Sequence, residues 1–334
     1  MDSSPPFTAA VVQAEPAWLD APGTLQKTLR LIAEAADNGA RIIAFPEVWF
    51  PGYPMFLWLG AVIEQMPMIG RYHANSITTD GPELTAIRHC ARSHSVTVVL
   101  GYSERRAGSL YIAQTAIGPE GEILLHRRKL KPTHVERSLF GEGDGSDLTV
   151  VPTSLGRLGA LSCAEHVQPL SKFALYAQHE QIHVASWPCF GLYRNLAYAL
   201  SPEVNMAATQ TYALEGGCFV LASTQLITEE SIALFATTAT QRAMISPGGG
   251  FSRIYGPDGR QLSEDLPEQV EGLVYAQIDL GAIALAKNAF DPAGHYSRGD
   301  VARLLLDDRP RRLLVTPDGE GFEAAMFPEL HEIR

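Results

Sequence analysis

Cys163 is the side chain in this sequence best placed to act as a nucleophile. It follows an apolar run that begins at Val150 and precedes a helical pattern over residues 170–177, where a buried strand ends and a helix approaches. A thiol at such a turn can be exposed, and nearby backbone N–H groups lower its pKa and hold a developing anion. Cys163 could instead be a small buried side chain, but the polar pair Glu165 and His166 and two upstream stretches favour the nucleophile.

The first upstream stretch, residues 45–54, carries a candidate base. An apolar strand over residues 41–45 delivers Glu47 into a loop that is rich in proline and aromatic side chains. Desolvation by aromatic neighbours raises the pKa of a carboxyl group toward neutrality, which suits a general base. A structural role, in which Glu47 caps the loop by accepting backbone N–H bonds, fits the same sequence.

The second upstream stretch, residues 126–137, carries a candidate cation. Lys129 stands where a predicted strand finishes, and its ammonium could stabilise negative charge on a reacting heteroatom. Glu136 follows seven residues later and could hold that ammonium in place. A solvated basic stretch paired with Glu136 is the alternative.

The elements around these residues predict an α/β fold in which helices cover a sheet. Residues 7–14, 24–40 and 41–45 indicate a β-α-β start. Further strands are expected at 96–103, 110–117, 123–126, 181–188 and 218–222, and further helices at 82–93, 169–178 and 205–214. Residues 252–259 and 272–279 are expected to pair with each other. The carboxylate, the lysine and the cysteine each follow an apolar strand, so we expect them to converge at one sheet edge.

Composition excludes several classes of protein. The 334 residues are 46% hydrophobic and 19% charged, which indicates a compact globular chain. The net charge of −11 argues against a nucleic-acid partner. The four cysteines lack metal-type spacing and no leader pattern is seen, which predicts a cytoplasmic protein with reduced thiols. The longest apolar stretch is too short for a membrane segment.

No shift in composition, repeat or linker divides the chain. We therefore predict a single domain over residues 1–334. Residues from about 281 onward are expected to form a C-terminal extension. We expect a surface loop and a short helix in it, through residues 301–306.

Residues 45–54, 126–137 and 161–170 resemble the three signatures of the nitrilase (carbon–nitrogen hydrolase) superfamily, and the resemblance covers nearly the whole chain. The run from Cys163 to Leu170 and the run 291–298 are more similar to true nitrilases, among them bacterial arylacetonitrilases, than to the amidase or carbamoylase branches. The resemblance implies a four-layer α-β-β-α sandwich and a homo-oligomer, either a dimer or a spiral of dimers. It also implies a catalytic triad of Glu47, Lys129 and Cys163, with Glu136 in support and no metal or organic cofactor.

The implied reaction converts a small-molecule nitrile into a carboxylic acid and ammonia through a thioimidate on Cys163. Nitrilases commonly carry Trp directly after the cysteine, whereas this chain carries Ala164. The smaller side chain predicts a bulky substrate, an arylacetonitrile or an α-substituted nitrile, with amide as a by-product. Tyr53, His134 and Trp187 are expected to line the pocket with Ala164.

Other functions stay open at this point. Within the same superfamily they are an aliphatic nitrilase, a cyanide hydrolase and an amidase. From a different class, a binding protein could hold a metal through Cys163, Glu165 and His166. His166 lies three residues after Cys163 in the same turn, so we expect it to be structural rather than the base of a Cys–His pair.

Overall fold

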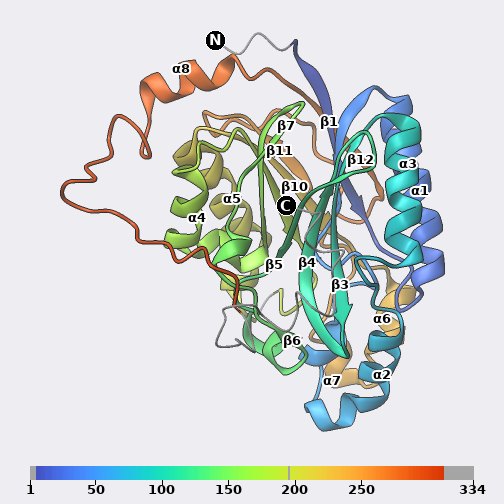
Figure 1. Ribbon diagram of the computed structural model, residues 1–334. Coiled ribbons are helices and arrows are strands. Elements are labelled where there is room, and N and C mark those ends of the chain that lie inside the picture. The colour runs from blue at the N-terminus through green and yellow to red at the C-terminus, as the bar shows by residue number, and fades with distance from the viewer. Residues whose placement is uncertain (1–4, 195, 312–334) are drawn as a thin grey trace, which may run out of the picture.

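The structure is a computed structural model that describes residues 5–194 and 196–311 (Figure 1). The strands are β1 (Phe7–Ala14), β2 (Ala40–Ala44), β3 (Thr97–Arg106), β4 (Ser109–Ile117), β5 (Ile123–Arg128), β6 (Phe140–Gly141), β7 (Val151–Thr153), β8 (Gly156–Ser162), β9 (Ile182–Trp187), β10 (Phe219–Gln225), β11 (Arg253–Tyr255) and β12 (Gly272–Ile278). The helices are α1 (Ala21–Asp37), α2 (Met66–Ala74), α3 (Pro82–His94), α4 (Pro169–Tyr176), α5 (Pro202–Gly216), α6 (Glu229–Phe235), α7 (Ala239–Arg242) and α8 (Ala282–Ala289).

The strands follow the order β5-β4-β3-β2-β1-β10-β9-β8-β7, with β6 beside β4, β12 beside β1 and β11 beside β10. The run from β3 through β1 and β10 to β8 is parallel throughout. Strands β1 and β10 pair only at one end, through Gln13 with Thr224 and Ala14 with Gln225. Because they separate beyond that point, the two halves of the sheet can turn their inner faces toward each other.

Four layers result from this arrangement. Helices α1 and α3 pack on the outer face of the half that holds β1 to β4, and α4 and α5 pack on the outer face of the half that holds β8 to β10 (Figure 1). Between the two halves lies a separate apolar core that takes side chains from both, including Val11, Leu158 and Leu221. The predicted α-β-β-α sandwich is confirmed.

Strand β1 shows how the sequence specifies these layers. Ala10, Val12 and Ala14 pack toward the helices, whereas Ala9 and Val11 pack into the core between the sheet halves. Successive side chains of a strand point to opposite faces, so both faces of β1 are apolar because both are covered. The continuous apolar run in the sequence therefore marks an inner strand.

Two helices begin earlier than predicted because of their caps. Helix α1 starts at Ala21, since the Asp20 side chain accepts the N–H of Gly23 and Pro22 fits the first turn. Helix α5 starts at Pro202, since the Ser201 side chain accepts the N–H of Val204, and it ends at Gly216, before the capping residue Gly217, whose φ is 56°. Hydrophobic periodicity alone did not predict these first turns, which the capping residues specify.

The predicted pairing between residues 252–259 and 272–279 is wrong. Strand β11 pairs antiparallel with β10, and β12 pairs antiparallel with β1 over seven residue pairs from Phe7 with Ile278 to Gln13 with Gly272. Both β1 and β10 offer free edges, because they contact each other only at one end. The sequence pattern shows which residues are buried and carries no information about which edge a strand occupies.

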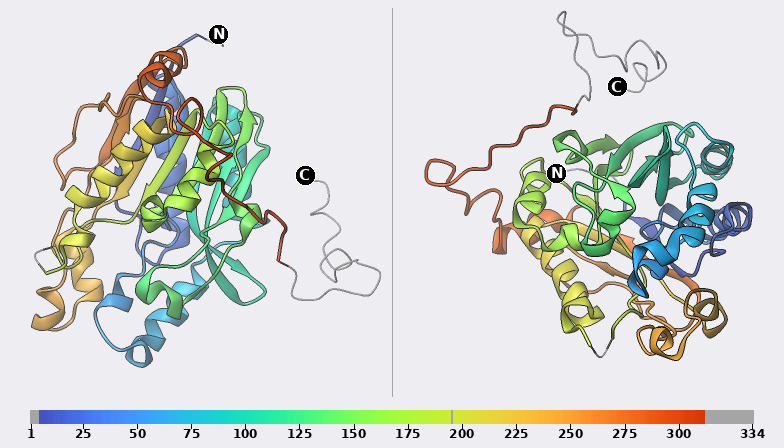
Figure 2. Two further views of the ribbon diagram at one scale, coloured as in Figure 1. Left: turned by 90° about the vertical axis from the view of Figure 1, so that its left-hand side faces the viewer. Right: turned by 90° about the horizontal axis from the view of Figure 1, so that it is seen from below.

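The C-terminal extension begins with α8 and continues without helix or strand to residue 311. Residues 301–306 are thus not helical, and Leu304 and Leu306 instead pack against the core beneath α4 and α5. Figure 2 shows this segment running outside the four layers. Residues 312–334 of the predicted extension lie outside the described residues. Within the described ranges no helix combines the length and apolar character needed to cross a lipid bilayer.

Candidate active site

Cys163 lies at the turn between β8 and a short 3-10 helix, Cys163–Val167. Its φ is 49°, in the left-handed region that residues other than glycine rarely adopt. The Cys163 side chain is partly exposed, whereas Ser162 before it is buried. The predicted position of the thiol at the end of a buried strand is confirmed, and the backbone there is strained in a way that surrounding contacts need to maintain.

Glu165 supplies some of those contacts. One carboxylate oxygen accepts the N–H of Ser162 at 2.8 Å, and the other accepts the N–H of Leu130 at 2.8 Å and the guanidinium of Arg127 at 2.7 Å. Burial alone would raise the pKa of Glu165, but Arg127 outweighs burial, and the pKa is lowered. The charged side chain ties the cysteine turn to Leu130, the residue that follows Lys129.

Glu47 lies in the loop after β2 and is completely buried. Its N–H donates to the carbonyl oxygen of Trp187 at 3.3 Å, and its own carbonyl oxygen accepts the Gln225 side chain at 2.7 Å. The loop passes directly against Gly101, where an added Cβ would lie 2.3 Å from the carbonyl oxygen of Pro46. Glycine at this position therefore allows the close approach that sets Glu47 over the sheet.

Lys129 directly follows β5 and is enclosed between two carboxylates. Its Nζ donates to Glu47 Oε1 and to Glu136 Oε2, each at 2.8 Å, and all three side chains are buried. Burial alone would lower the pKa of Lys129, but Glu136 and Glu47 outweigh it and hold the pKa well above its usual value. Lys129 is therefore a fixed positive charge inside the protein.

Glu136 lies in a 3-10 helix, His134–Ser138, and is oriented from several sides. Its Oε2 accepts the N–H of Thr133 at 2.6 Å in addition to Lys129, and its Oε1 accepts the hydroxyl of Tyr53 at 2.8 Å. The indole N–H of Trp58 donates to the same hydroxyl at 3.1 Å. These contacts fix the carboxylate, and through it they fix the Lys129 ammonium.

The pKa values of Glu47 and Cys163 indicate that Glu47 is the base and that Cys163 is a neutral thiol at rest. Burial raises the pKa of Glu47 to about 8, and Glu136 adds to the rise while Lys129 opposes it. Burial also raises the pKa of Cys163 well above its usual value, with Glu47 acting in the same direction. The backbone N–H of Ala164 and the charge of Lys129 work against that rise. Cys163 thus rests as a thiol and needs a base at the moment of reaction.

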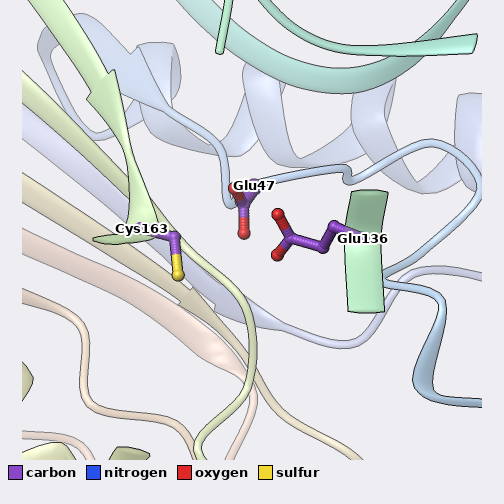
Figure 3. Close-up of side chains that lie close together, drawn as sticks. All are labelled: Glu47, Glu136 and Cys163. Atoms are coloured by element: carbon purple, nitrogen blue, oxygen red, sulfur yellow. The ribbon is translucent and has the colours of Figure 1, made fainter. Parts of the chain in front are cut away.

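Figure 3 shows the side chains of Glu47, Glu136 and Cys163 lying close together from three separate segments of the chain. One potential ligand atom from each side chain lies within 4.8 Å of the other two. Among residues 5–194 and 196–311, these three side chains form the one group that could hold a metal ion. Lys129 donates to both carboxylates, so the positive charge that a metal ion would supply is already present. The donor set fits an ammonium better than a divalent cation.

The alternative metal site at Cys163, Glu165 and His166 does not form. Both oxygens of Glu165 accept hydrogen bonds from Arg127 and from backbone N–H groups. His166 Nδ1 lies 2.8 Å from the carbonyl oxygen of Cys163, so this nitrogen is engaged with the backbone rather than with a shared ligand position. The binding-protein interpretation loses its structural basis.

The residues predicted to line the pocket occupy different surroundings. Ala164 is partly exposed beside Cys163, and His134 is exposed and stacks on Trp58 with ring centroids 4.9 Å apart. Tyr53 is buried against Glu136, and Trp187 is buried with its ring stacked on His166. Contact of these side chains with a substrate stays a prediction.

Two surface grooves lie away from this cluster. One, of about 660 Å³, runs between α4 and the C-terminal segment, and the other, of about 470 Å³, lies beside β6. None of the residues that line them is Glu47, Lys129, Glu136 or Cys163. We therefore locate the site by its convergent reactive groups rather than by the size of a cavity.

Sequence reasoning did not identify three of the residues that build the site. Arg127 stands in a run of basic residues that resembles an exposed surface, yet it is completely buried. Gly101 and Gln225 lie in strands far along the chain from the loop that they support. A buried arginine needs a paired carboxylate, and the partner of Arg127, Glu165, lies 38 positions away, so no local pattern indicated Arg127.

Comparison with known proteins gives a consistent result. The carbon-nitrogen hydrolase family model matches residues 8–288. The chain is 52% identical over 310 residues to a nitrilase of Pseudomonas syringae pv. syringae, covering 93% of this chain and 92% of that protein. It is 50% identical over 304 residues to an aliphatic nitrilase of Rhodococcus rhodochrous, covering 91% and 83%.

A third relative, an arylacetone-specific nitrilase of Alcaligenes faecalis, is 48% identical over 323 residues, covering 97% of this chain and 91% of that protein. Among solved structures, a carbon-nitrogen hydrolase of Helicobacter pylori G27 superposes with a TM-score of 0.70 at 19% identity, over 88% of this chain and 96% of that one. The structural match supports the fold described above.

Proposed function

The chain belongs to the carbon–nitrogen hydrolase family, and on that premise we propose that it is a nitrilase, which converts an organic nitrile into a carboxylic acid and ammonia. The observation that carries the proposal is a catalytic cluster of Glu47, Lys129, Glu136 and Cys163. In it the sulfur and both carboxyl groups lie within 4.8 Å around a buried ammonium. Relatives named nitrilase at about half identity support a nitrile rather than an amide as the substrate.

In the first chemical step Glu47 takes the proton of the Cys163 thiol, and Sγ forms a bond to the nitrile carbon. The raised pKa of Glu47, about 8, makes it a stronger base than an ordinary carboxylate. Negative charge develops on the nitrile nitrogen, where Lys129 and the N–H of Ala164 stabilise it. Transfer of the proton from Glu47 to that nitrogen completes a neutral thioimidate.

Hydrolysis then uses the same base twice. Glu47 removes a proton from a water molecule whose oxygen adds to the thioimidate carbon, and the nitrogen takes up protons until the C–N bond breaks and ammonia leaves. The product is a thioester on Cys163. A second water molecule, activated in the same way, breaks the C–S bond, releases the carboxylic acid and returns the proton to the thiol.

For the substrate we propose an arylacetonitrile or an α-substituted nitrile. Ala164 supports this choice, because a methyl group beside Cys163 leaves more room at the thioimidate than a large side chain would. The stacked pair of Trp58 and His134 adds an aromatic surface near Glu136 on which an aryl group could pack. The relatives are named for both aliphatic and arylacetone substrates, so their names leave this choice to experiment.

A substrate panel tests the proposal. The purified protein is incubated with phenylacetonitrile, mandelonitrile, a short aliphatic nitrile, cyanide and phenylacetamide, and ammonia, acid and amide are quantified. Acid and ammonia from the aryl nitriles, abolished in Cys163→Ala, would support an arylacetonitrilase. Turnover of the short nitrile or of cyanide alone would contradict the substrate class, and turnover of the amide alone would contradict the nitrilase.

Ala164→Trp tests the role of the small side chain. We expect this variant to lose activity mainly toward mandelonitrile, which is substituted next to the reacting carbon, and to form less amide, because the intermediate has less freedom to reorient and expel the thiol. The ratio of acid to amide and the order of substrate preference are the measurements. An unchanged ratio and unchanged order would remove the argument from Ala164.

We further propose that the protein is a homo-oligomer. Large apolar side chains are exposed on α8 and the segment after it: Leu285, Phe290, Tyr296, Val301 and Leu305. An exposed group of this kind favours contact with another protein surface. Light scattering of the purified protein should give a mass that is a multiple of 36.3 kDa, and a mass of one chain at all concentrations would contradict the proposal.

A further inference from the structure

Behind the nucleophile lies a second group of titratable side chains, which we call the support cluster: His166, His183, Glu180 and Tyr212. All four are buried. His166 comes from the turn after Cys163, His183 from β9, Glu180 from the segment that leads into β9, and Tyr212 from α5. His166 Nδ1 lies 2.8 Å from the carbonyl oxygen of Cys163. None of the four takes part in the hydrolysis steps above.

The four side chains form a continuous hydrogen-bonded row. His166 Nε2 lies 3.0 Å from His183 Nε2, and His183 Nδ1 lies 2.7 Å from Glu180 Oε1. The hydroxyl of Tyr212 donates to Glu180 Oε2 at 2.6 Å. Gly159 makes room for the row, because a Cβ at that position would lie 2.0 Å from Glu180 Oε1.

The row ends at the carbonyl oxygen of Cys163, and this acceptor determines which atom donates and which accepts in each hydrogen bond of the row. A carbonyl oxygen only accepts, so His166 Nδ1 carries the proton that it donates to Cys163. A neutral His166 then accepts at Nε2 from His183, whose Nδ1 accepts in turn from a protonated Glu180. Burial supports this neutral arrangement, since it lowers the pKa of both histidines well below the usual value and raises the pKa of Glu180 to about 8.

The row ends on the peptide group between Cys163 and Ala164. In a trans peptide the C=O and the N–H point in opposite directions, so a partner that holds the carbonyl also sets the direction of the N–H. The Ala164 N–H belongs to this peptide group, and it favours the Cys163 thiolate because it works against the rise in the pKa of the thiol. Cys163 itself has a φ of 49°, a strained conformation that surrounding contacts need to maintain, and the contact of His166 with its carbonyl oxygen is one of them.

We propose that His166, held in one tautomer by His183 and Glu180, is a positioning residue that aims the Ala164 N–H at the Cys163 sulfur and at the anion that develops on the substrate nitrogen. This inference rests on the proposed function and deepens it. Trp187 stabilises the arrangement from the side, because its ring stacks on His166 with centroids 5.1 Å apart. The backbone of the same Trp187 accepts the N–H of Glu47, so one residue of β9 contacts both the base and the support cluster.

Two substitutions at one position separate this role from packing. In His166→Asn the side-chain amide nitrogen replaces Nδ1 and can still donate to the Cys163 carbonyl, while the contact with His183 is lost. In His166→Gln the amide lies one bond farther out, so it can reach His183 but leaves the carbonyl without its donor. Both variants lose the imidazole ring, which makes them matched in lost packing and polarity.

We expect His166→Gln to lower kcat for phenylacetonitrile about 10- to 100-fold with little change in KM, because a donor to the developing anion is misdirected. His166→Asn should keep kcat within about threefold of the wild type, because the donor to the Cys163 carbonyl is kept. The buried His183 N–H loses its acceptor, which should lower the stability of the variant rather than its kcat. A second readout needs no nitrile: the rate at which iodoacetamide alkylates Cys163 should fall in His166→Gln and be retained in His166→Asn. Circular dichroism and thermal unfolding report how much of each variant is folded.

Tyr176→Phe is the control variant. The ring of Tyr176 packs against Tyr212, but its hydroxyl donates to Glu215 rather than to a member of the row, so loss of that hydroxyl should leave both rates unchanged. Equal loss of kcat in both His166 variants, in proportion to the loss of folded protein, would show that His166 only fills space and would overturn the proposal. A wild type that hydrolyses no nitrile would overturn the proposed function instead, and the alkylation rates would still decide the role of His166.

Discussion

Two clusters of titratable side chains meet at Cys163, and each contains a buried glutamate whose pKa burial raises to about 8. The catalytic cluster lies on the side of the sulfur, and the support cluster lies on the side of the carbonyl oxygen. In the catalytic cluster Glu47 Oε2 is buried without a hydrogen-bond partner, and the neighbouring residue Cys163 is partly exposed. In the support cluster both oxygens of Glu180 are paired.

The comparison teaches that a perturbed pKa does not by itself identify a catalytic group. Burial raises the pKa of both glutamates to about 8, yet of the two only Glu47 keeps a carboxylate oxygen without a hydrogen-bond partner, and it lies close to the Cys163 sulfur. Charge differs as well. Lys129 holds a permanent positive charge next to Glu47, whereas the row from His166 to Tyr212 is complete when every member is neutral.

Glu47→Gln should produce the largest effect. The amide cannot take the thiol proton, so we expect kcat to fall about 10²- to 10⁴-fold, the usual contribution of a general base. Nitrile hydrolysis and the alkylation of Cys163 by iodoacetamide are the two measurements, with Cys163→Ala as the inactive reference. If Glu47→Gln retained wild-type alkylation at neutral pH, Glu47 would not be the base.

Glu136→Gln should have a smaller effect, because Glu136 acts through Lys129 rather than on the substrate. Lys129 Nζ now donates to the Glu136 carboxylate at 2.8 Å, and a neutral amide binds the ammonium more weakly. We therefore expect kcat to fall about 10- to 100-fold. Tyr53→Phe is the matched variant, since it removes only the hydroxyl that donates to Glu136 and should cost less. A larger loss in Tyr53→Phe than in Glu136→Gln would point to direct contact of Tyr53 with the substrate.

The pH dependence of alkylation should report on Glu47. Its pKa is raised to about 8, so the base is protonated as the pH falls below that value and the rate of thiolate formation falls with it. The groups that act on Glu47 are Lys129, Glu136 and Glu165, and none of them is exposed. We expect the rate to drop about tenfold per pH unit between pH 7 and pH 6. A rate that is flat from pH 6 to pH 8 would contradict this assignment.

Local sequence patterns were sufficient to predict the positions of the reactive groups. Cys163, Lys129 and Glu47 each follow a strand, and burial of both sheet faces gives those strands continuous apolar runs that are easy to recognise. Because parallel strands end at a common edge, the convergence of the three side chains followed from their places in the chain.

The contacts that hold those groups could not be predicted in the same way. His183 lies opposite Gly159 in the pairing of β8 with β9, and Glu180 reaches the row only because that residue is glycine. Arg127 reaches Glu165 across 38 positions of sequence. Such pairs depend on the register between strands, which apolar periodicity does not specify. The partners of β11 and β12 were missed for the same reason.

Glu180→Gln should produce the smallest effect on activity, although it repeats the chemical change made in Glu47→Gln. The amide can donate to His183 Nδ1 as the neutral acid does, and its carbonyl oxygen can accept from Tyr212, so the direction of the row is kept. We expect kcat to stay within about threefold of the wild type, because no buried group loses its partner. A loss as large as that of Glu47→Gln would mean that Glu180 works as a carboxylate.

The two Gln variants should nevertheless behave alike in stability. Each glutamate has a folded pKa raised from 4.5 to about 8, so its contribution to stability is complete below pH 4.5 and is lost as the pH rises through 8. The unfolding midpoint of the wild type should fall between pH 5 and pH 9, and either substitution should make that fall smaller. Only Glu47→Gln should also lower kcat strongly. If only one variant showed a flatter pH dependence of the unfolding midpoint, the other glutamate would be ionised in the folded protein at neutral pH. The two glutamates would then differ in charge, and burial would not raise both pKa values alike.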